Sequence, residues 1–546
     1  MSELIRNSKF ISFILILVGT IRSWWQQGAI CRLFAYLQRI SRSSTAYRVW
    51  LRWGNAPNAA EHSLMSHFVA FAQRQLEKIG VWIANSVIYH LCSKISGYCK
   101  KSLILRLVGK LQPHQWFILA FAWYLPLEYL IRDTLHLALL SSVWEELFLL
   151  AGICLCLYRR AMRRGSRSVR VTVLDAAMLL FFAVGFFLMS VVRPYPEVAL
   201  PGYRIVVQYM LWYFIILYLL EDDKDVRVLM FSFLALLAFL SLHGVYQFVI
   251  GVEIPSSWVT STETGVRTRV FSLTGSPNIL GSLLVLLTPL AASGIYYFSR
   301  KSSKIACFAL VCCSLMTLLF TFSRGAWLGI MLAIIIFAVF IDRRLLAMMS
   351  AGIAACLIFV PSITSRITYL FTEDYAVASA VGGRALRWET GRILLNENNP
   401  LLGFGLGRFG GAVAMDNQLL DKTESFSYFY MDNYYLKTLV EMGWLGLLVY
   451  VLLLLVLLYL GVKAIQRSDI SFAALPGDAL QRANGNIRIL CIGIFSGLCG
   501  VLLHCYFENI FEEPYMSAYF WGLSALLLYL GFFKNKQPDD NRKINK

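Results

Sequence analysis

Long uncharged apolar segments constrain this chain more than any other feature of its sequence. Residues 305–341 contain one charged side chain, Arg324, and similar apolar segments recur along the chain. A helix that rises about 1.5 Å per residue needs about 20 such residues to cross a bilayer core of about 30 Å. Of the 546 residues, 58% are hydrophobic and 15% are charged, which excludes an ordinary soluble enzyme and a disordered chain. The sequence therefore predicts a polytopic membrane protein.

Twelve candidate transmembrane helices follow Gln115, and they predict an all-α fold. They lie near residues 115–131, 137–158, 171–192, 205–220, 228–250, 277–298, 305–322, 325–341, 345–361, 434–462, 489–506 and 518–533. With the N-terminal region inside, the inner linkers and tail hold 22 Lys and Arg residues and the short outer loops hold six. The positive-inside rule favours this orientation. It leaves residues 362–433 as a large extracytoplasmic loop, whose length indicates a functional or separately folded segment.

The N-terminal region, residues 1–113, differs from the polytopic region, residues 114–546. It holds 15 Lys and Arg residues against three acids, interleaved with aromatic and aliphatic side chains. This composition is typical of amphipathic helices that lie on anionic lipid. We therefore expect a cytoplasmic or interfacial region that contacts membrane lipids, and no nucleic-acid partner.

The cysteines and histidines give no support for a metal or another cofactor. Most of the 12 Cys lie inside apolar segments, and no CxxC pair occurs. The seven His show no metal-binding spacing such as HExxH. We predict an activity that needs no cofactor.

Ser323-Arg324-Gly325 is the sharpest local motif, because Arg324 interrupts an otherwise apolar segment. Ionisable groups near membrane depth usually have partners, and a small residue lets a ligand or backbone approach closely. The motif indicates an anion contact. A plain hairpin turn at the outer surface is the alternative.

A second basic motif lies in the long loop. If residues 384–392 are helical, Arg384, Trp388 and Arg392 follow one another at i, i+4 and i+8, and Arg387 borders their face. Such a face offers fork-shaped donors to a phosphate. The alternative is a solvated amphipathic helix in which the arginines pair with Glu389 and Glu397.

The segment Pro400 to Gly411 is rich in glycine and could wrap a phosphate with its amides. A loop hinge is an equally good interpretation. It is not a dinucleotide fingerprint, because that motif needs a strand before it and a helix after it.

Acid–base candidates lie at the predicted outer ends of the last helices. Asp432 and Asn433 precede the tenth span, where a helix N-cap is the alternative. His504 and Glu508 end the eleventh span at i and i+4, where a His is often structural. A carboxylate or imidazole there could take a proton from a sugar hydroxyl.

In their order, these motifs resemble the O-antigen ligase and polymerase superfamily of bacterial envelope glycosyltransferases. The resemblance covers roughly residues 265–530 and rests on Arg269 with Ser276-Pro277-Asn278, Ser323-Arg324-Gly325, Arg384 with Trp388, Pro400 with Gly403-Phe404-Gly405, and Asp432-Asn433 with Glu441, Gly443 and Gly446. It implies a GT-C-type fold of about twelve spans in the bacterial cytoplasmic (inner) membrane, with the active site on the outer face. It also implies a polyprenyl diphosphate-linked glycan as donor, a glycan acceptor, and metal-independent transfer with inversion.

The resemblance implies roles for individual residues. The substrate-binding residues are Arg269, Arg324, Arg384, Arg387, Arg392 and Asn433. Asp432 orients or deprotonates the acceptor hydroxyl, and His504 is the competing base. In the ligase branch a His precedes the loop-end Asn, whereas this chain has Asp432, which favours a polymerase of repeat units over a ligase. A lipid-linked oligosaccharide flippase or exporter is the alternative from another class.

Overall fold

The computed structural model describes residues 71–72, 74–81, 85–86, 111–136, 138–162, 170–192, 195–253, 268–381, 383–418, 429–470 and 478–534. Within these ranges the chain forms helices and loops and no strand. Almost all of the predicted interfacial region 1–113 lies outside the described residues. The elements below belong to the compact unit formed by Leu76–Gly165 and Thr172–Lys546.

The first half of this unit contains the helices α8 to α18. Their bounds are α8 (Pro113–Ala122), α9 (Tyr124–Tyr129), the π-helical turn η1 (Leu130–Thr134), α10 (Ala138–Ser141), α11 (Trp144–Met162), α12 (Val173–Val191), α13 (Pro196–Val207), the 3₁₀ turn η2 (Gln208–Leu211), α14 (Trp212–Leu219), α15 (Asp223–Ile250), α16 (Pro277–Tyr297), α17 (Lys301–Phe320) and α18 (Arg324–Phe340).

The second half runs from α19 to the end of the described chain. Its elements are α19 (Arg344–Phe359), α20 (Pro361–Thr368), η4 (Tyr369–Phe371), α21 (Glu373–Val381), α22 (Arg384–Glu397), α23 (Ala412–Asn417), α24 (Tyr434–Ile470), α25 (Asp478–His504), η5 (Ile510–Glu512), α26 (Pro514–Leu528) and η6 (Tyr529–Phe533). The predicted all-α, multi-pass membrane fold is confirmed.

Eight helical segments of the described chain are long and apolar enough to span a membrane: 173–191, 196–219, 223–250, 277–297, 301–320, 434–468, 487–504 and 514–533. The other four predicted spans also fall on helices, but on shorter, bent or more charged ones. Helix α8 ends at Ala122, before α9, α11 carries four charged residues, α18 has 17 residues, and α19 is followed by a 97° bend. The count of twelve stays a prediction.

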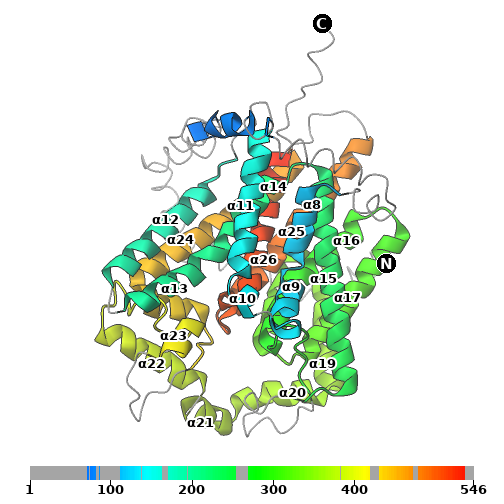
Figure 1. Cartoon of the computed structure of the whole chain (residues 1–546). Helices are drawn as coiled ribbons and strands as arrows, with labels where there is room; N and C mark the ends of the chain where they lie inside the picture. Colours follow the sequence, from blue (N-terminus) through cyan, green and yellow to red (C-terminus); the bar gives the residue numbers. More distant parts are fainter. Residues whose placement is uncertain are drawn as a thin grey trace, which may run out of the picture. The chain divides into compact units, whose positions relative to one another are not determined.

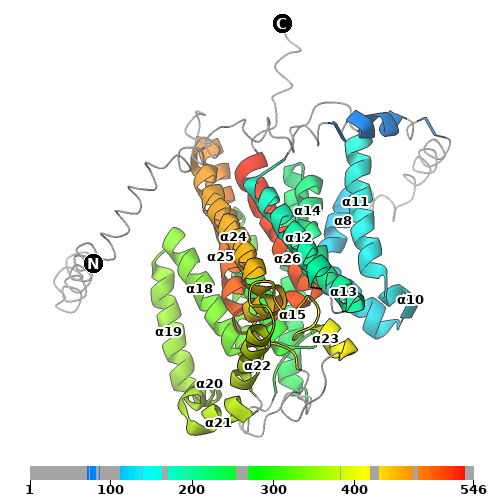
Figure 2. The same ribbon diagram turned by 90° about the vertical axis from the view of Figure 1, so that its left-hand side faces the viewer.

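Helices α16, α25 and α26 form the centre of the unit. Helix α16 packs against α25 and α17, and α18 packs against α25. In α26, 89% of the most apolar segment is buried, against 22% in α17. Figure 2 shows α19 at the edge beside α18, and no α19 side chain is buried. The outer helices therefore present their apolar faces to lipid.

Proline and an aspartate fix where several helices begin. Pro277, Pro361 and Pro514 occupy the first turn of α16, α20 and α26, where the missing amide costs no hydrogen bond. Asp222 caps α15 by accepting from the amides of Lys224 and Asp225.

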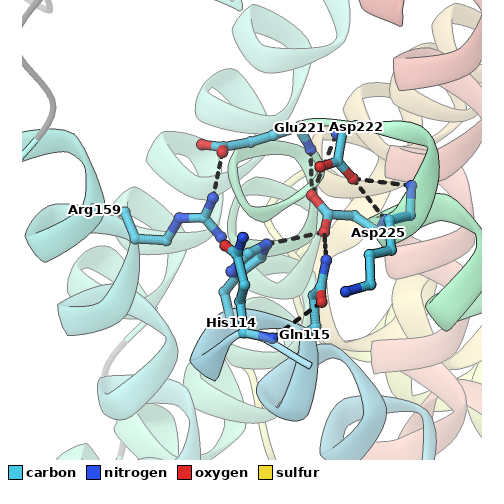
Figure 3. A network of polar contacts seen from close by, with 8 residues as sticks. His114, Gln115, Arg159, Glu221, Asp222 and Asp225 are labelled. Atoms are coloured by element: carbon cyan, nitrogen blue, oxygen red, sulfur yellow. Dashed lines mark hydrogen bonds and ion pairs between the residues drawn. The ribbon is translucent and has the colours of Figure 1, made fainter. Parts of the chain in front are cut away.

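Buried polar residues hold the start of α15 to α8 and α11, as Figure 3 shows. One carboxylate oxygen of Asp225 accepts from Gln115 at 2.7 Å and lies 2.9 Å from the Nε2 of His114. The backbone amide of Glu221 donates to the other oxygen at 2.9 Å, and Arg159 pairs with the Glu221 side chain. Every charge of this group has a partner, as burial requires.

The short helices α20 to α23 gather at one end of the long helices, at the bottom of Figures 1 and 2. The start of α15 and the network of Figure 3 lie toward the other end. Residues 362–433 are thus largely helical where they are described. Their extracytoplasmic location stays a prediction.

Candidate functional site

The Asp432 carboxylate joins the start of α22 to the start of α24. The Nε of Arg384 donates to its Oδ2 at 2.7 Å, and the Nε1 of Trp388 donates to its Oδ1 at 3.0 Å. A terminal nitrogen of Arg387 lies 3.9 Å from Oδ2. We call Asp432, Arg384, Arg387 and Trp388 the Asp432 cluster. Its two arginines give it a net positive charge.

Arg384 has a second anchor. One terminal nitrogen of its guanidinium donates to the carbonyl oxygen of Phe507 at 2.9 Å. The side chain is nevertheless about one third exposed, at 34%, whereas that of Asp432 is 9% exposed. Arg384 is therefore held from two sides and still presents charge to a ligand.

The other two arginines of α22 are held less tightly than Arg384, and Arg392 lies outside the Asp432 cluster. Arg387 is 30% exposed and donates to the carbonyl oxygen of Tyr430 at 3.3 Å. Arg392 is 62% exposed and pairs with Glu389 at 3.4 Å, as the alternative interpretation of this helix expected. Helical geometry explains the difference, because eight residues at 3.6 per turn rotate Arg392 by about 80° from Arg384.

A chain of polar contacts connects Arg269 to Glu508. The guanidinium of Arg269, 8% exposed, donates to the carbonyl oxygen of Thr321 at 3.1 Å and to the Oδ1 of Asn278 at 3.4 Å. The amide of Asn278 donates in turn to the carboxylate of Glu508. Burial raises the pKa of the Glu508 carboxyl. The positive charge of Arg384 opposes this shift, and the negative charge of Asp432 adds to it. The motif around Ser276-Pro277-Asn278 thus reaches the end of α25.

His504 lies in a closed environment at the end of α25. It is 1% exposed, and its Nδ1 is 2.9 Å from the hydroxyl of Ser282. A Cβ at Gly325 would fall 2.7 Å from the imidazole Cδ2, so only glycine lets α18 begin this close to the ring. The start of α18 therefore lies beside His504. Arg324, the first residue of this helix, is partly exposed.

Asn433 acts as a helix cap. Its side-chain oxygen accepts from the amide of Leu436 at 3.0 Å, and its carbonyl oxygen accepts from the amide of Lys437 at 2.9 Å. The N-cap interpretation is therefore confirmed for Asn433. Its predicted contact with substrate stays a prediction.

The glycine-rich loop fills a break in α24. Gly443, with φ +64°, interrupts that helix, and Gly403, with φ +86°, lies directly against it. The amides of Phe404 and Gly405 donate to carbonyl oxygens of α24 at 2.7 and 3.0 Å. These amides are thus engaged by the protein itself, and the loop holds the broken helix together.

A buried ion network supports that loop, and sequence reasoning missed it. The ammonium of Lys437 lies 2.8 Å from the Oε2 of Glu441 and 3.4 Å from the Oε2 of Glu512. The other oxygen of Glu441 accepts from the amide of Phe409 at 3.1 Å. The i, i+4 spacing of Lys437 and Glu441 in an apolar helix was the available signal. No signal in the sequence connected them to Glu512.

Comparisons with known proteins agree with the arrangement of the motifs. Residues 308–451 match the family model described as O-antigen ligase. The match runs from within α17 to the first part of α24, and so includes Arg324 and the whole Asp432 cluster. A search of curated proteins found no match. Among the described residues, no group of three His, Cys, Asp or Glu side chains could hold a metal ion.

Proposed function

We propose that this chain, of which residues 308–451 match the O-antigen ligase family model, polymerises lipid-linked oligosaccharide repeat units into a cell-surface polysaccharide. The donor is a polyprenyl diphosphate-linked glycan, and the acceptor is a hydroxyl of a second glycan. The acceptor oxygen attacks the anomeric carbon while the bond to the diphosphate breaks on the opposite side. The configuration inverts, and the lipid diphosphate leaves with the electron pair.

The observation that carries this proposal is the double anchoring of Arg384. Asp432 and the carbonyl of Phe507 fix its guanidinium, and one third of the side chain remains exposed. A pre-oriented cation stabilises charge that develops on a leaving group without reorganising during the reaction. Arg384 can therefore neutralise a departing diphosphate.

Two other arginines are connected to the same site. Arg387 adjoins Arg384 in the Asp432 cluster, and Arg269 reaches Glu508 through Asn278. We assign Arg324, at the start of α18, to the same diphosphate. Arg392 is largely exposed and paired with Glu389, so we expect it to contribute least.

Asp432 acts in this proposal as a positioning residue. Of its two predicted roles we favour orientation, because Trp388 and Arg384 each engage one of its oxygens. His504 is the weaker base candidate, because a side chain that is 1% exposed and packed against Gly325 would have to move to meet an acceptor.

Transfer of a finished glycan to another acceptor, as by a ligase, is the second candidate function. The presence of Asp432 where the ligase branch has a His favours polymerisation. Deleting the gene and analysing the surface glycan by mass spectrometry distinguishes the two. Loss of a polymerase leaves single repeat units, whereas loss of a ligase leaves full polymers that are not attached.

A flippase or exporter would also bind diphosphates. It should carry basic groups along the middle of its spans, whereas the Asp432 cluster lies with α22 at one end of the long helices (Figure 2). Purified protein incubated with lipid-linked repeat units separates the classes, because a carrier makes no longer glycan.

A further inference from the structure

We propose that Glu508 is the general base that removes the proton from the acceptor hydroxyl, an assignment that rests on the proposed glycan transfer. Glu508 follows the end of α25, in the turn that leads to η5 (Ile510–Glu512). Three observations support it: the position of its carboxylate between two arginine-bearing segments, its accessibility, and the charges around it.

The position of Glu508 is fixed from two directions. Asn278, from the first turn of α16, donates its side-chain amide to the carboxylate and contacts Arg269 through its own oxygen. The residue before Glu508, Phe507, binds the guanidinium of Arg384 at 2.9 Å through its carbonyl oxygen. A donor whose diphosphate binds Arg384 would therefore place its sugar within reach of the Glu508 carboxylate.

Glu508 is more accessible than its two competitors. The oxygens of Asp432 each accept a side-chain donor, and that side chain is 9% exposed. His504 is 1% exposed. Glu508 is partly exposed and makes one side-chain hydrogen bond, to Asn278. Within the part of the chain that the structure describes, it has no ion pair to break before it accepts a proton.

The charges around Glu508 favour this role. Burial raises the pKa of the Glu508 carboxyl, Arg384 of α22 opposes that shift, and Asp432 before α24 adds to it. Glu513, before α26, is a further acidic neighbour. A base is most effective when its pKa approaches the working pH, and a carboxylate with a raised pKa meets this condition better than an ordinary one.

The step balances as follows. The acceptor O–H bond breaks and its proton moves to the Glu508 carboxylate, while the acceptor oxygen forms the new bond to the anomeric carbon. The bond between that carbon and the diphosphate breaks, and the diphosphate keeps the electron pair beside Arg384. Glu508 then releases the proton to solvent.

Purified full-length protein in lipid nanodiscs, supplied with a polyprenyl diphosphate-linked repeat unit, tests the assignment. Glu508→Gln keeps an oxygen for Asn278 but removes the base, so kcat should fall about 100-fold or more. Donor binding, measured as the rise in Tm at saturating donor, should be unchanged. Glu508→Asp should recover part of the rate. The matched control is Glu373→Gln, which changes an exposed carboxylate of α21 and should keep the parent rate.

The pH dependence of kcat supplies a second test. The parent protein should lose activity at acidic pH as Glu508 becomes protonated, and Glu508→Gln should lack this acidic limb. A Glu508→Gln protein with parental kcat and an intact acidic limb would refute the assignment and leave the proposed function standing. If Glu508→Gln does not fold, Glu508→Asp decides. It sets the carboxylate back by one methylene and should lower kcat, so a parental kcat would overturn the assignment. A parent protein that makes no longer glycan overturns the proposed function as well.

Discussion

Arg384 donates its Nε to the Oδ2 of Asp432 at 2.7 Å across 48 residues of sequence. The contact joins the first residue of α22 to the segment just before α24. Helix α24 is the one that Gly443 interrupts and against which the glycine-rich loop packs. The orientation of Arg384 therefore depends on a carboxylate from another element. The first two predictions follow from this pair.

Replacing Arg384 should abolish most glycan elongation. Arg384→Ala removes the preorganised charge and should lower kcat about 100- to 1,000-fold. Arg384→Lys should recover little, because an ammonium cannot copy the fork that contacts Asp432 and Phe507 together. Arg204→Ala, a half-exposed arginine paired with Glu146, is the control and should stay near the parent rate. Parent-like elongation by Arg384→Ala would remove this residue from the mechanism.

The Arg384–Asp432 pair should behave as one unit. Asp432→Ala releases Arg384, so the double variant with Arg384→Ala should be hardly slower than Arg384→Ala alone. Asp432→Asn should lose less activity than Asp432→Ala, because the amide keeps an oxygen that can accept a hydrogen bond. A double-mutant cycle on the elongation rate measures the coupling. Additive losses would mean that Asp432 acts independently of Arg384.

Gly403→Ala should destabilise the protein. A Cβ there would fall 2.4 Å from the nitrogen of Gly443 and 2.5 Å from the Glu441 carbonyl oxygen, at φ +86°. Backbone strain alone should cost about 1–3 kcal/mol, visible as a lower Tm in detergent. Gly352→Ala is the matched control, since nothing lies within 4 Å of a Cβ at Gly352. Equal Tm values for both variants would argue against tight packing of the glycine-rich loop in the break of α24.

Glu513 should make stability depend on pH. Burial raises the pKa of Glu513 from 4.5 to about 7. The folded state then binds a proton that the unfolded chain has released, so stability falls as pH rises from about 4.5 through about 7. Glu513→Gln removes this dependence. The Tm of Glu513→Gln minus that of the parent should therefore be larger at pH 8 than at pH 5, and a difference independent of pH would contradict the assignment.

The long apolar segments of the sequence predict most of its helices, because the length of such a segment is enough to indicate a membrane span. It also predicts that Arg384 and Trp388 share a helical face, since i, i+4 spacing is local. The partner of that face is Asp432, 48 residues away from Arg384, and no local pattern specifies it. The break at Gly443 is likewise set by contact with a distant loop, so the sequence alone predicts one uninterrupted helix.

The most direct test of the central claim measures polyprenyl diphosphate release and glycan length together. Purified protein in proteoliposomes receives lipid-linked repeat units of one length. The account predicts a ladder of longer glycans, one polyprenyl diphosphate released for each new glycosidic bond, and loss of both products in Arg384→Ala. Glycan that crosses the bilayer without lengthening, or a ladder that Arg384→Ala still makes at the parent rate, would contradict it.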